Sequence, residues 1–247
     1  MTDELRILPL RGIPELEEGD DLAALLGEAV TRVGGFENDD VLVVAQKAVS
    51  KVEGRVVDLA EIEPSDRARE LAADTDPRRL EVILREAREV VKARPPLVIA
   101  ETRHGFVCAS AGVDASNAKG PDTVILLPVD PDASAAALRD AIRRRLGVEV
   151  GVIVSDSFGR AWRRGTTDVA LGVSGMAALV DLSGQRDASG YELHATEIAV
   201  ADEIAGAAQL VMGKTAGIPA AIVRGLRLSG DGSGSELVMP RERDLFR

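Results

Sequence analysis

Three stretches of the sequence place acidic, basic or hydroxyl side chains beside apolar runs, where a folded chain can direct them at a ligand. The first, 112–117 (GVDASN), combines Asp114, Ser116 and Asn117 in one loop that contains a glycine. Carboxylate, hydroxyl and amide oxygens are the ligands that Mg²⁺ and Mn²⁺ prefer. An Asx turn explains the same residues without a metal, and from this loop alone we favour the turn.

The second stretch, 151–157 (GVIVSDS), is an apolar run that ends in an acidic and two hydroxyl side chains. Asp156 and Ser157 would follow a buried strand, and open sheets bind ligands and metals at the carboxyl ends of their strands. A helix N-cap or a turn accounts for Asp156 without a ligand. The residues that follow favour the ligand site.

Those residues are strongly basic. Arg160, Arg163 and Arg164 lie within five positions of one another, and Thr-Thr-Asp follows at 166–168. Guanidinium groups match phosphates and carboxylates in geometry. We expect the three arginines to form a cationic pocket wall beside Asp156; a solvated run of charge is the alternative.

The third stretch, 212–219 (MGKTAGIP), places Lys214 and Thr215 between glycines. Gly-Lys-Thr is the end of a phosphate-binding P-loop pattern, but the pattern is incomplete because position 208 is alanine. A glycine-flanked loop can still present backbone N–H groups to a phosphate.

Two lysines also follow an apolar run. Lys47 and Lys51 come after DVLVVA, where they can act as point charges for a polyphosphate or be solvated. Together with the carboxylates and the glycine-flanked loop they predict phosphoryl or nucleotide chemistry with a divalent cation. No Ser–His–Asp arrangement is recognisable, and we interpret His104, His194 and Cys108 as structural residues.

Composition excludes several classes of protein. The 247 residues carry a net charge of −11, and an acidic chain repels nucleic-acid phosphates and anionic membrane surfaces. Aromatic residues make up 2%, so we expect a core of Ala, Val, Leu and Ile and no aromatic stacking platform. One cysteine and two histidines exclude an internal disulfide, a cysteine-rich zinc site and a three-histidine site. Neither a leader nor an apolar run of about 20 residues is present, which predicts a cytoplasmic protein.

The elements that must position these residues are mixed, without regular βαβ alternation, and predict an α+β fold. We expect one domain, 1–247, either undivided or made of two subdomains that share one core, with a loose tail over 229–247. The run 169–182 fits either a strand or a helix. Hydrophobic periodicity predicts strands at 5–10, 40–45, 97–102, 106–111, 123–127, 149–154 and 219–223, and helices at 22–30, 65–73, 77–92, 132–145 and 193–212.

Several motifs, in order over residues 5–228, resemble one known family. They are LPLRGIPELEEGDDL, DVLVVAQKAVSKVEGR, AGVDASN, LLPVDPDASA, GVIVSDSFGRAWRRG, DASGYEL, VADEIA and GIPAAIVRGL. The chain is similar to the coenzyme F420-0:γ-glutamyl ligases, including the N-terminal half of the two-domain actinobacterial enzyme. The flavin-reductase-like half of that enzyme has no counterpart here.

The resemblance implies both an architecture and an activity. It implies a mixed-sheet α+β fold, unlike ATP-grasp ligases, that assembles as an intertwined homodimer. It implies addition of L-glutamate, and then of further γ-linked glutamates, to the deazaflavin coenzyme F420-0. The reaction would consume GTP, proceed through an acyl phosphate, and require two divalent cations, Mg²⁺ or Mn²⁺, with K⁺ as a further ion.

The same resemblance implies roles for individual residues. Lys51, Asp114 and Asp156 would be catalytic, and Asp114, Asp156 and Ser157 would hold metal. Lys214 departs from the family pattern, in which many relatives carry an acidic or amide residue that reaches a metal. The residues around GTP would be Ile13, Pro14, Glu15, Leu16, Gln46, Lys47, Lys51, Asn117, Met212, Gly213, Lys214, Thr215, Ala216, Gly217, Ile218 and Pro219.

The arginine run has the least direct assignment. Our hypothesis is that Arg160, Arg163 and Arg164 hold the phosphodiester of the substrate or the carboxylates of the incoming glutamate. Two other functions remain open at this point. One is a related metal-dependent amide ligase with another carboxylate or nucleotide, and the other is a catalytically silent nucleotide-binding module.

Overall fold

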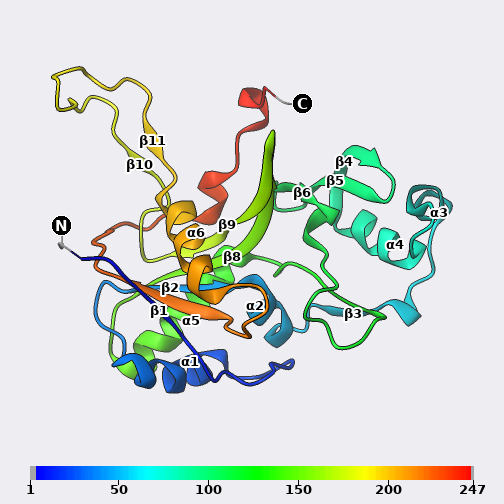
Figure 1. Ribbon diagram of the computed structural model, residues 1–247, viewed down its shortest axis with the longest axis horizontal. Helices are drawn as coiled ribbons and strands as arrows, with labels where there is room; N and C mark the ends of the chain where they lie inside the picture. Colours follow the sequence, from blue (N-terminus) through cyan, green and yellow to red (C-terminus); the bar gives the residue numbers. More distant parts are fainter. Residues whose placement is uncertain (1–3, 246–247) are drawn as a thin grey trace.

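A computed structural model describes residues 4–245, and its largest element is a five-stranded mixed sheet (Figure 1). All neighbouring strands run antiparallel except β2 and β8, which are parallel. The α+β prediction is therefore confirmed. In spatial order the strands are β1 (Arg6–Pro9), β12 (Ala220–Arg224), β2 (Val41–Ala45), β8 (Gly151–Arg160) and β9 (Arg163–Ser174).

Helices cover both faces of this sheet. Because side chains alternate along a strand, Leu42 and Val44 of β2 face one way and Val41 and Val43 face the other. The first pair packs in a core with α1 (Leu22–Val30) and α5 (Pro131–Leu146), and the second pair packs with α6 (Val200–Met212). Phe106 is the only buried aromatic residue among those described, so the expected aliphatic core is confirmed.

A smaller lobe lies to one side of the sheet (Figure 1, cyan). It has its own apolar core, in which Leu71, Ile83 and Val98 are buried. The short pair β3 (Val56–Asp58) and β7 (Thr123–Ile125) links it to the main sheet. The lobe is built from α3 (Asp66–Ala72), α4 (Pro77–Glu86), β4 (Ala87–Arg94), β5 (Leu97–Thr102) and β6 (Val107–Ala109).

The predicted helix over 77–92 is wrong in its second half. The helix ends at Glu86, and 87–94 forms strand β4, which pairs with β5 as a hairpin. Glu and Arg at helical spacing suggested an exposed helix face, but pairing with β5 satisfies the backbone and lets Val90 and Ala93 pack against the core of the lobe. Long-range pairing thus overrides local periodicity here.

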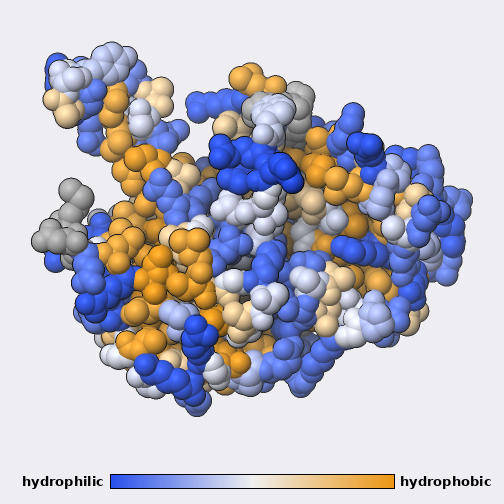
Figure 2. Space-filling model, viewed as in Figure 1, coloured by the Kyte–Doolittle hydropathy of each residue, from blue (hydrophilic) through white to orange (hydrophobic). Residues whose placement is uncertain are grey.

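The predicted helix over 193–212 begins too early. The helix α6 starts at Val200, and residues 193–199 belong to the returning side of a mostly exposed hairpin arm. Its base is the pair β10 (Val180–Asp181) and β11 (Glu197–Ile198), and it stands clear of the rest of the surface (Figures 1 and 2). The run 169–182, left open between strand and helix, is strand as far as Ser174.

The segment 229–235, expected to be loose, is packed against β9. The Gly232 N–H donates to the Met176 carbonyl at 2.9 Å, and the Gly234 N–H donates to Asp132 Oδ1 at 2.6 Å. A Cβ at Gly234 would lie 2.1 Å from the Leu171 carbonyl oxygen, so only glycine allows this approach. Glycines that suggested freedom of the chain serve close packing instead.

Within residues 4–245, no helix is both long enough and apolar enough to cross a membrane.

Candidate functional site

A cavity of about 350 Å³ opens where the parallel strands β2 and β8 part. The two strands pair as far as Ala45 and Ser155, after which the chain turns from β2 into α2 (Gln46–Val52). β8 continues to Arg160, paired only with β9. Asp156 therefore lies inside a long strand, whereas the sequence suggested that it follows the end of one. It still lies at the carboxyl edge of the parallel pair, the usual ligand position in open sheets.

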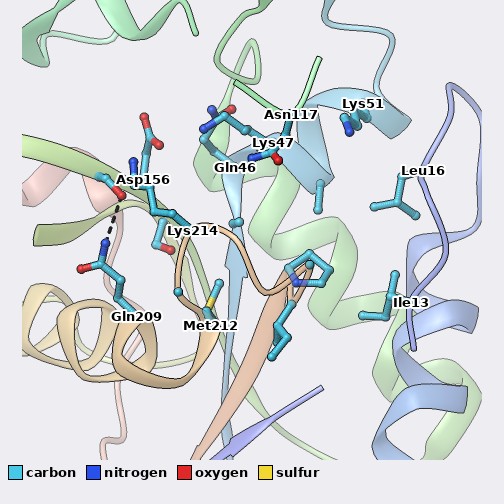
Figure 3. A pocket seen from close by; sticks show the side chains of 18 of the residues that line it. Ile13, Leu16, Gln46, Lys47, Lys51, Asn117, Asp156, Gln209, Met212 and Lys214 are labelled. Carbon is cyan, nitrogen blue, oxygen red and sulfur yellow. Dashed lines mark hydrogen bonds between the residues drawn. The ribbon is translucent and has the colours of Figure 1, made fainter. Parts of the chain in front are cut away.

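The cavity brings together nearly all of the residues expected around a nucleotide (Figure 3). Ala216 alone of that set does not line it. In the view of Figure 3, Lys214 lies toward Asp156, whereas Ile13, Leu16 and Lys51 lie at the opposite end. The expected residues that line the cavity are Ile13, Pro14, Glu15, Leu16, Gln46, Lys47, Lys51, Asn117, Met212, Gly213, Lys214, Thr215, Gly217, Ile218 and Pro219, together with Asp156 and Ser157.

Two lysines of α2 form one wall. Lys47 and Lys51 are four residues apart and therefore share a face of the helix. Their side chains are only 15% and 11% exposed, so neither is a solvated surface lysine. Lys47 Nζ lies 2.8 Å from Asp114 Oδ2, and Lys51 pairs with Glu15. The helix thus holds two ammonium groups at the cavity by means of carboxylates that a ligand can replace.

Asp114 lies behind this wall and does not line the cavity itself. Its carboxylate accepts hydrogen bonds from the N–H and the hydroxyl of Ser116, each at 2.8 Å, so the Asx turn is present. Burial raises the pKa of Asp114, but the bonds from Lys47 and Ser116 outweigh it and hold the pKa below its ordinary value. The carboxylate is therefore ionised and already close to the cationic wall.

Asp156 is in a different electrostatic environment. Burial, with smaller effects from the charges of Asp114 and Asp168, raises the pKa of Asp156 to about 6, although the charge of Lys47 and the Ser157 N–H oppose it. The buried thiol of Cys108 has its pKa raised to about 12, by burial and by the charge of Asp156. Negative charge at this end of the cavity is undercompensated, so a cation bound there would be stabilised.

The donor set fits a hard divalent cation. Two carboxylates and a serine hydroxyl offer only oxygen, which suits Mg²⁺ or Mn²⁺ and not a thiolate or imidazole metal. Within the described part of the chain, no group of three His, Cys, Asp or Glu side chains is arranged to hold a metal alone. Mg²⁺ commonly completes its shell with substrate phosphates and water, so an incomplete protein cage is expected for a nucleotide-bound cation.

The three arginines are not part of the cavity wall, contrary to our expectation. Arg160, Arg163 and Arg164 lie at the exposed tip of the β8–β9 hairpin, next to Trp162. Strand residues advance about 3.3 Å each, so Arg160 lies about 13 Å along the strand from Asp156. The reason is that β8 continues to Arg160 as a two-stranded ribbon with β9, whereas the sequence suggested that the strand ends before Asp156.

Sequence reasoning assigned no role to three polar residues of the cavity. Ser155, Asp168 and Gln209 line it, and Ser155 and Asp168 are buried. Asp168 ends the Thr-Thr-Asp run, which looks unlike an ordinary solvated segment. Gln209 is a polar residue on the apolar helix α6, between buried Ala208 and Met212, and a polar side chain on such a face is the signal that could have identified it.

Comparison with known proteins agrees with this site. A family described as "F420-0:Gamma-glutamyl ligase" matches residues 12–225. Proteins named coenzyme F420:L-glutamate ligase are 47% identical in Methanopyrus kandleri, over 98% of both chains, and 48% identical in Methanocaldococcus jannaschii, over 86% of both. The Archaeoglobus fulgidus protein of that name is 43% identical over 98% of this chain and 96% of its own.

The chain is therefore a ligase. It belongs to the F420-0:γ-glutamyl ligase family, as the motifs indicated.

Proposed function

We propose that the protein uses GTP to join L-glutamate to the terminal carboxylate of coenzyme F420-0, and then adds further glutamates through γ-linkages. One observation carries the proposal. Two largely buried lysines, a glycine-flanked loop and the carboxylates of Asp156 and Asp168 meet in one cavity at the carboxyl edge of a parallel strand pair. This combination suits a nucleoside triphosphate held with a divalent cation.

GTP would lie along the cavity between Ile13–Leu16 and the Asp156 end. Lys47 and Lys51 would exchange their carboxylate partners for phosphate oxygens, and backbone N–H groups of the 212–219 loop would bind others. The ammonium groups are positioned before the ligand arrives, so little reorganisation accompanies the reaction.

In the first step a carboxylate oxygen of F420-0 attacks the γ-phosphorus of GTP. The bond from that phosphorus to the β,γ-bridging oxygen breaks, GDP leaves, and an acyl phosphate forms. Lys47 stabilises the charge that develops on the transferring phosphoryl group, and Lys51, toward the opposite end of the cavity, stabilises the charge that develops on the leaving GDP.

In the second step the amino nitrogen of glutamate, having lost a proton, attacks the acyl carbon. The carbon–oxygen bond to phosphate breaks, inorganic phosphate leaves, and the nitrogen loses a further proton to give the amide. Glutamate must therefore approach at the Asp156 end, beside the γ-phosphate.

Asp114, Asp156 and Ser157 would hold the divalent cations, Mg²⁺ or Mn²⁺, and K⁺ is a further ion of the proposal. A bound divalent cation supplies charge neutralisation on the phosphates. Lys214 contributes an ammonium group in the loop where a second cation would otherwise need another oxygen ligand. This end of the cavity would bind both the cations and the carboxylate of F420-0 that accepts the phosphoryl group. The cation requirement would account for its excess of carboxylate side chains.

The β8–β9 hairpin would guide the anionic tail of the substrate. When the reacting carboxylate of F420-0 lies beside Asp156, the rest of the extended substrate can follow the ribbon for about 13 Å. Its anionic tail then reaches Arg160, Arg163 and Arg164. We further propose that the chain works as a homodimer, in which the exposed hairpin tip lies in a shared groove.

The test is a ligation assay with GTP, Mn²⁺, L-glutamate and F420-0, read by mass spectrometry. We expect a series of products, each heavier than the one before by one glutamyl residue. One molecule of GDP should form for each glutamyl residue added. Product formed only when ATP replaces GTP, or only when another amino acid replaces L-glutamate, would show a different ligase. GTP binding without any product would show a silent nucleotide-binding module.

A further inference from the structure

The hydroxyl of Ser157 is held in a closed hydrogen-bond ring. It donates to Asp168 Oδ1 at 2.5 Å. It accepts from Gln209 Nε2 at 3.2 Å (Figure 3, dashed line at Gln209). The N–H of Asp168 in turn donates to Gln209 Oε1 at 3.3 Å. Both polar ends of Gln209 are used, so its orientation is fixed along with that of Ser157.

Three separate elements build this ring. Ser157 on β8 and Asp168 on β9 are direct partners across the hairpin, so their side chains share a face of the ribbon. Gln209 comes from α6, which packs against that face. Asp168 is only 6% exposed, and its second oxygen accepts from the Ser155 hydroxyl at 3.4 Å. The ring is therefore rigid before any ligand binds.

The ring decides what Ser157 can offer to a ligand. A hydroxyl has one proton to donate and two lone pairs to accept with. The proton is committed to Asp168 and one lone pair to Gln209, which leaves one lone pair for the cavity that Ser157 lines. A hydroxyl locked in this way can coordinate a cation through its remaining lone pair but cannot donate a hydrogen bond to an anion.

The local charge points in the same direction. Neither Asp156 nor Asp168 forms an ion pair with a lysine or arginine of the described residues, although both line the cavity. Two carboxylates and an acceptor-only hydroxyl at one end of a cavity favour a divalent cation over a phosphate oxygen.

We propose that Asp168 and Gln209 are positioning residues that lock the Ser157 hydroxyl as an oxygen ligand for a divalent cation. They act through Ser157 and do not touch the cation themselves. The inference rests on the proposed function, because that function places a cation at Ser157.

The experiment measures Mn²⁺ binding without turnover, by the electron paramagnetic resonance signal of free Mn²⁺ in the presence of GDP. We expect Ser157→Ala and Asp168→Asn each to weaken Mn²⁺ binding about tenfold, since partners of metal ligands commonly contribute 10- to 100-fold to affinity. The double variant should be no weaker than either single one, because both changes remove the same ligand. Gln209→Leu, which leaves both carboxylates in place, should weaken binding in the same direction.

Asp202→Asn is the matched control. Asp202 lies on α6 and accepts from the Ala170 N–H of β9 at 2.8 Å, so it links the same two elements, and among the described residues it forms no hydrogen bond with Ser157. We expect it to leave the Mn²⁺ dissociation constant unchanged. A loss of affinity in Asp202→Asn equal to that in Asp168→Asn would show a general loosening of α6 against β9 and would overturn the positioning role.

The remaining outcomes separate this inference from the proposed function. Weak binding in Ser157→Ala with normal binding in Asp168→Asn and Gln209→Leu overturns the positioning role but keeps the cation at Ser157. Additive losses show that Asp168 contacts the cation itself and also overturn it. Unchanged binding in Ser157→Ala removes both the inference and the cation placement, while the ligation assay tests the ligase activity independently.

Discussion

At the scale of single residues, the cavity is organised by charges that are held in pairs until a ligand arrives. Lys47 and Lys51 are largely buried on one face of α2, and each is neutralised by a carboxylate that also belongs to the site. A buried charge without a partner is costly, so the pairs keep the empty cavity stable. A polyphosphate can take over the same ammonium groups without moving the helix.

Lys51→Ala should lower kcat for ligation about 100-fold, because one preorganised cation is lost at the phosphates of the leaving GDP. Steady-state kinetics with saturating GTP measures the effect. Lys92→Ala is the control, since Lys92 is exposed on β4 in the smaller lobe. Equal kcat values for the two variants would contradict a role for Lys51 in the chemical step.

Much of this site could be predicted from the sequence, because its loops carry local signals. Asp114, Asp156 and the 212–219 loop each follow or precede an apolar run, and the structure places them around one cavity. Asp168 and Gln209 were missed because their importance depends on contacts across β9 and α6. A hydrogen bond between residues 52 positions apart leaves no local pattern to read.

At the scale of elements, the smaller lobe is tied together by one carboxylate. Glu81 of α4 accepts from the N–H and hydroxyl of Ser65, at 3.0 and 2.6 Å, and Ser65 is the N-cap of α3. Arg85 also donates to it, at 2.9 Å. These bonds, chiefly those from Ser65, lower the pKa of Glu81 to about 2. One side chain thus fixes the angle between two helices.

Glu81→Gln should lower the free energy of unfolding by about 1–2 kcal/mol at pH 7. The folded pKa lies below the unfolded value of 4.5, so the stabilisation is present above that pH and is lost as the pH falls toward 2. Urea denaturation at pH 7 and pH 3 should show a smaller difference from wild type at pH 3. Glu70→Gln, which breaks an exposed pair with Arg67, should cost no more than about 0.5 kcal/mol; an equal cost would contradict the account.

The β8–β9 ribbon carries the second prediction at this scale. Arg163→Ala or Arg164→Ala should raise the KM for F420-0 or L-glutamate about tenfold, because one charge-assisted hydrogen bond contributes roughly 1.5–3 kcal/mol. GTP binding, measured by calorimetry, should not change. Arg186→Ala on the exposed arm is the control. Unchanged KM values for both substrates would contradict the proposal that the arginines of the hairpin tip bind a substrate.

Helices and strands could be predicted where their own hydrophobic pattern determines them. They were harder to predict where a strand forms only by pairing with another part of the chain. Strands 5–10 and 219–223 were predicted within one residue of β1 and β12, since each is short and apolar. The helix–strand boundary at Glu86 was not, because β4 owes its conformation to pairing with β5. The arm over 180–198 was hidden for the same reason.

At the scale of the whole molecule, an acidic protein gathers three of its five lysines in one cavity. The net charge is −11, yet Lys47, Lys51 and Lys214 meet in one cavity. The strand order β1-β12-β2-β8-β9 makes this meeting, because it places the β2–α2 turn, the middle of β8 and the loop before β12 side by side. No local sequence pattern specifies that order.

The proposed homodimer predicts a mass in solution of twice 26.1 kDa. Light scattering after size-exclusion chromatography measures it directly, over a range of protein concentrations. A mass of 26.1 kDa at the concentration of the activity assay would contradict a shared groove. Ligation by that monomer would show that one chain holds the complete site.

The central claim is that the cavity activates the carboxylate of F420-0 as an acyl phosphate. The most direct test is to label both oxygens of that carboxylate with ¹⁸O, run one round of ligation with GTP and L-glutamate, and analyse the released phosphate by mass spectrometry. One ¹⁸O atom is expected in each phosphate, because the attacking carboxylate oxygen leaves with the phosphoryl group. Phosphate without label, formed together with the glutamylated product, would contradict it.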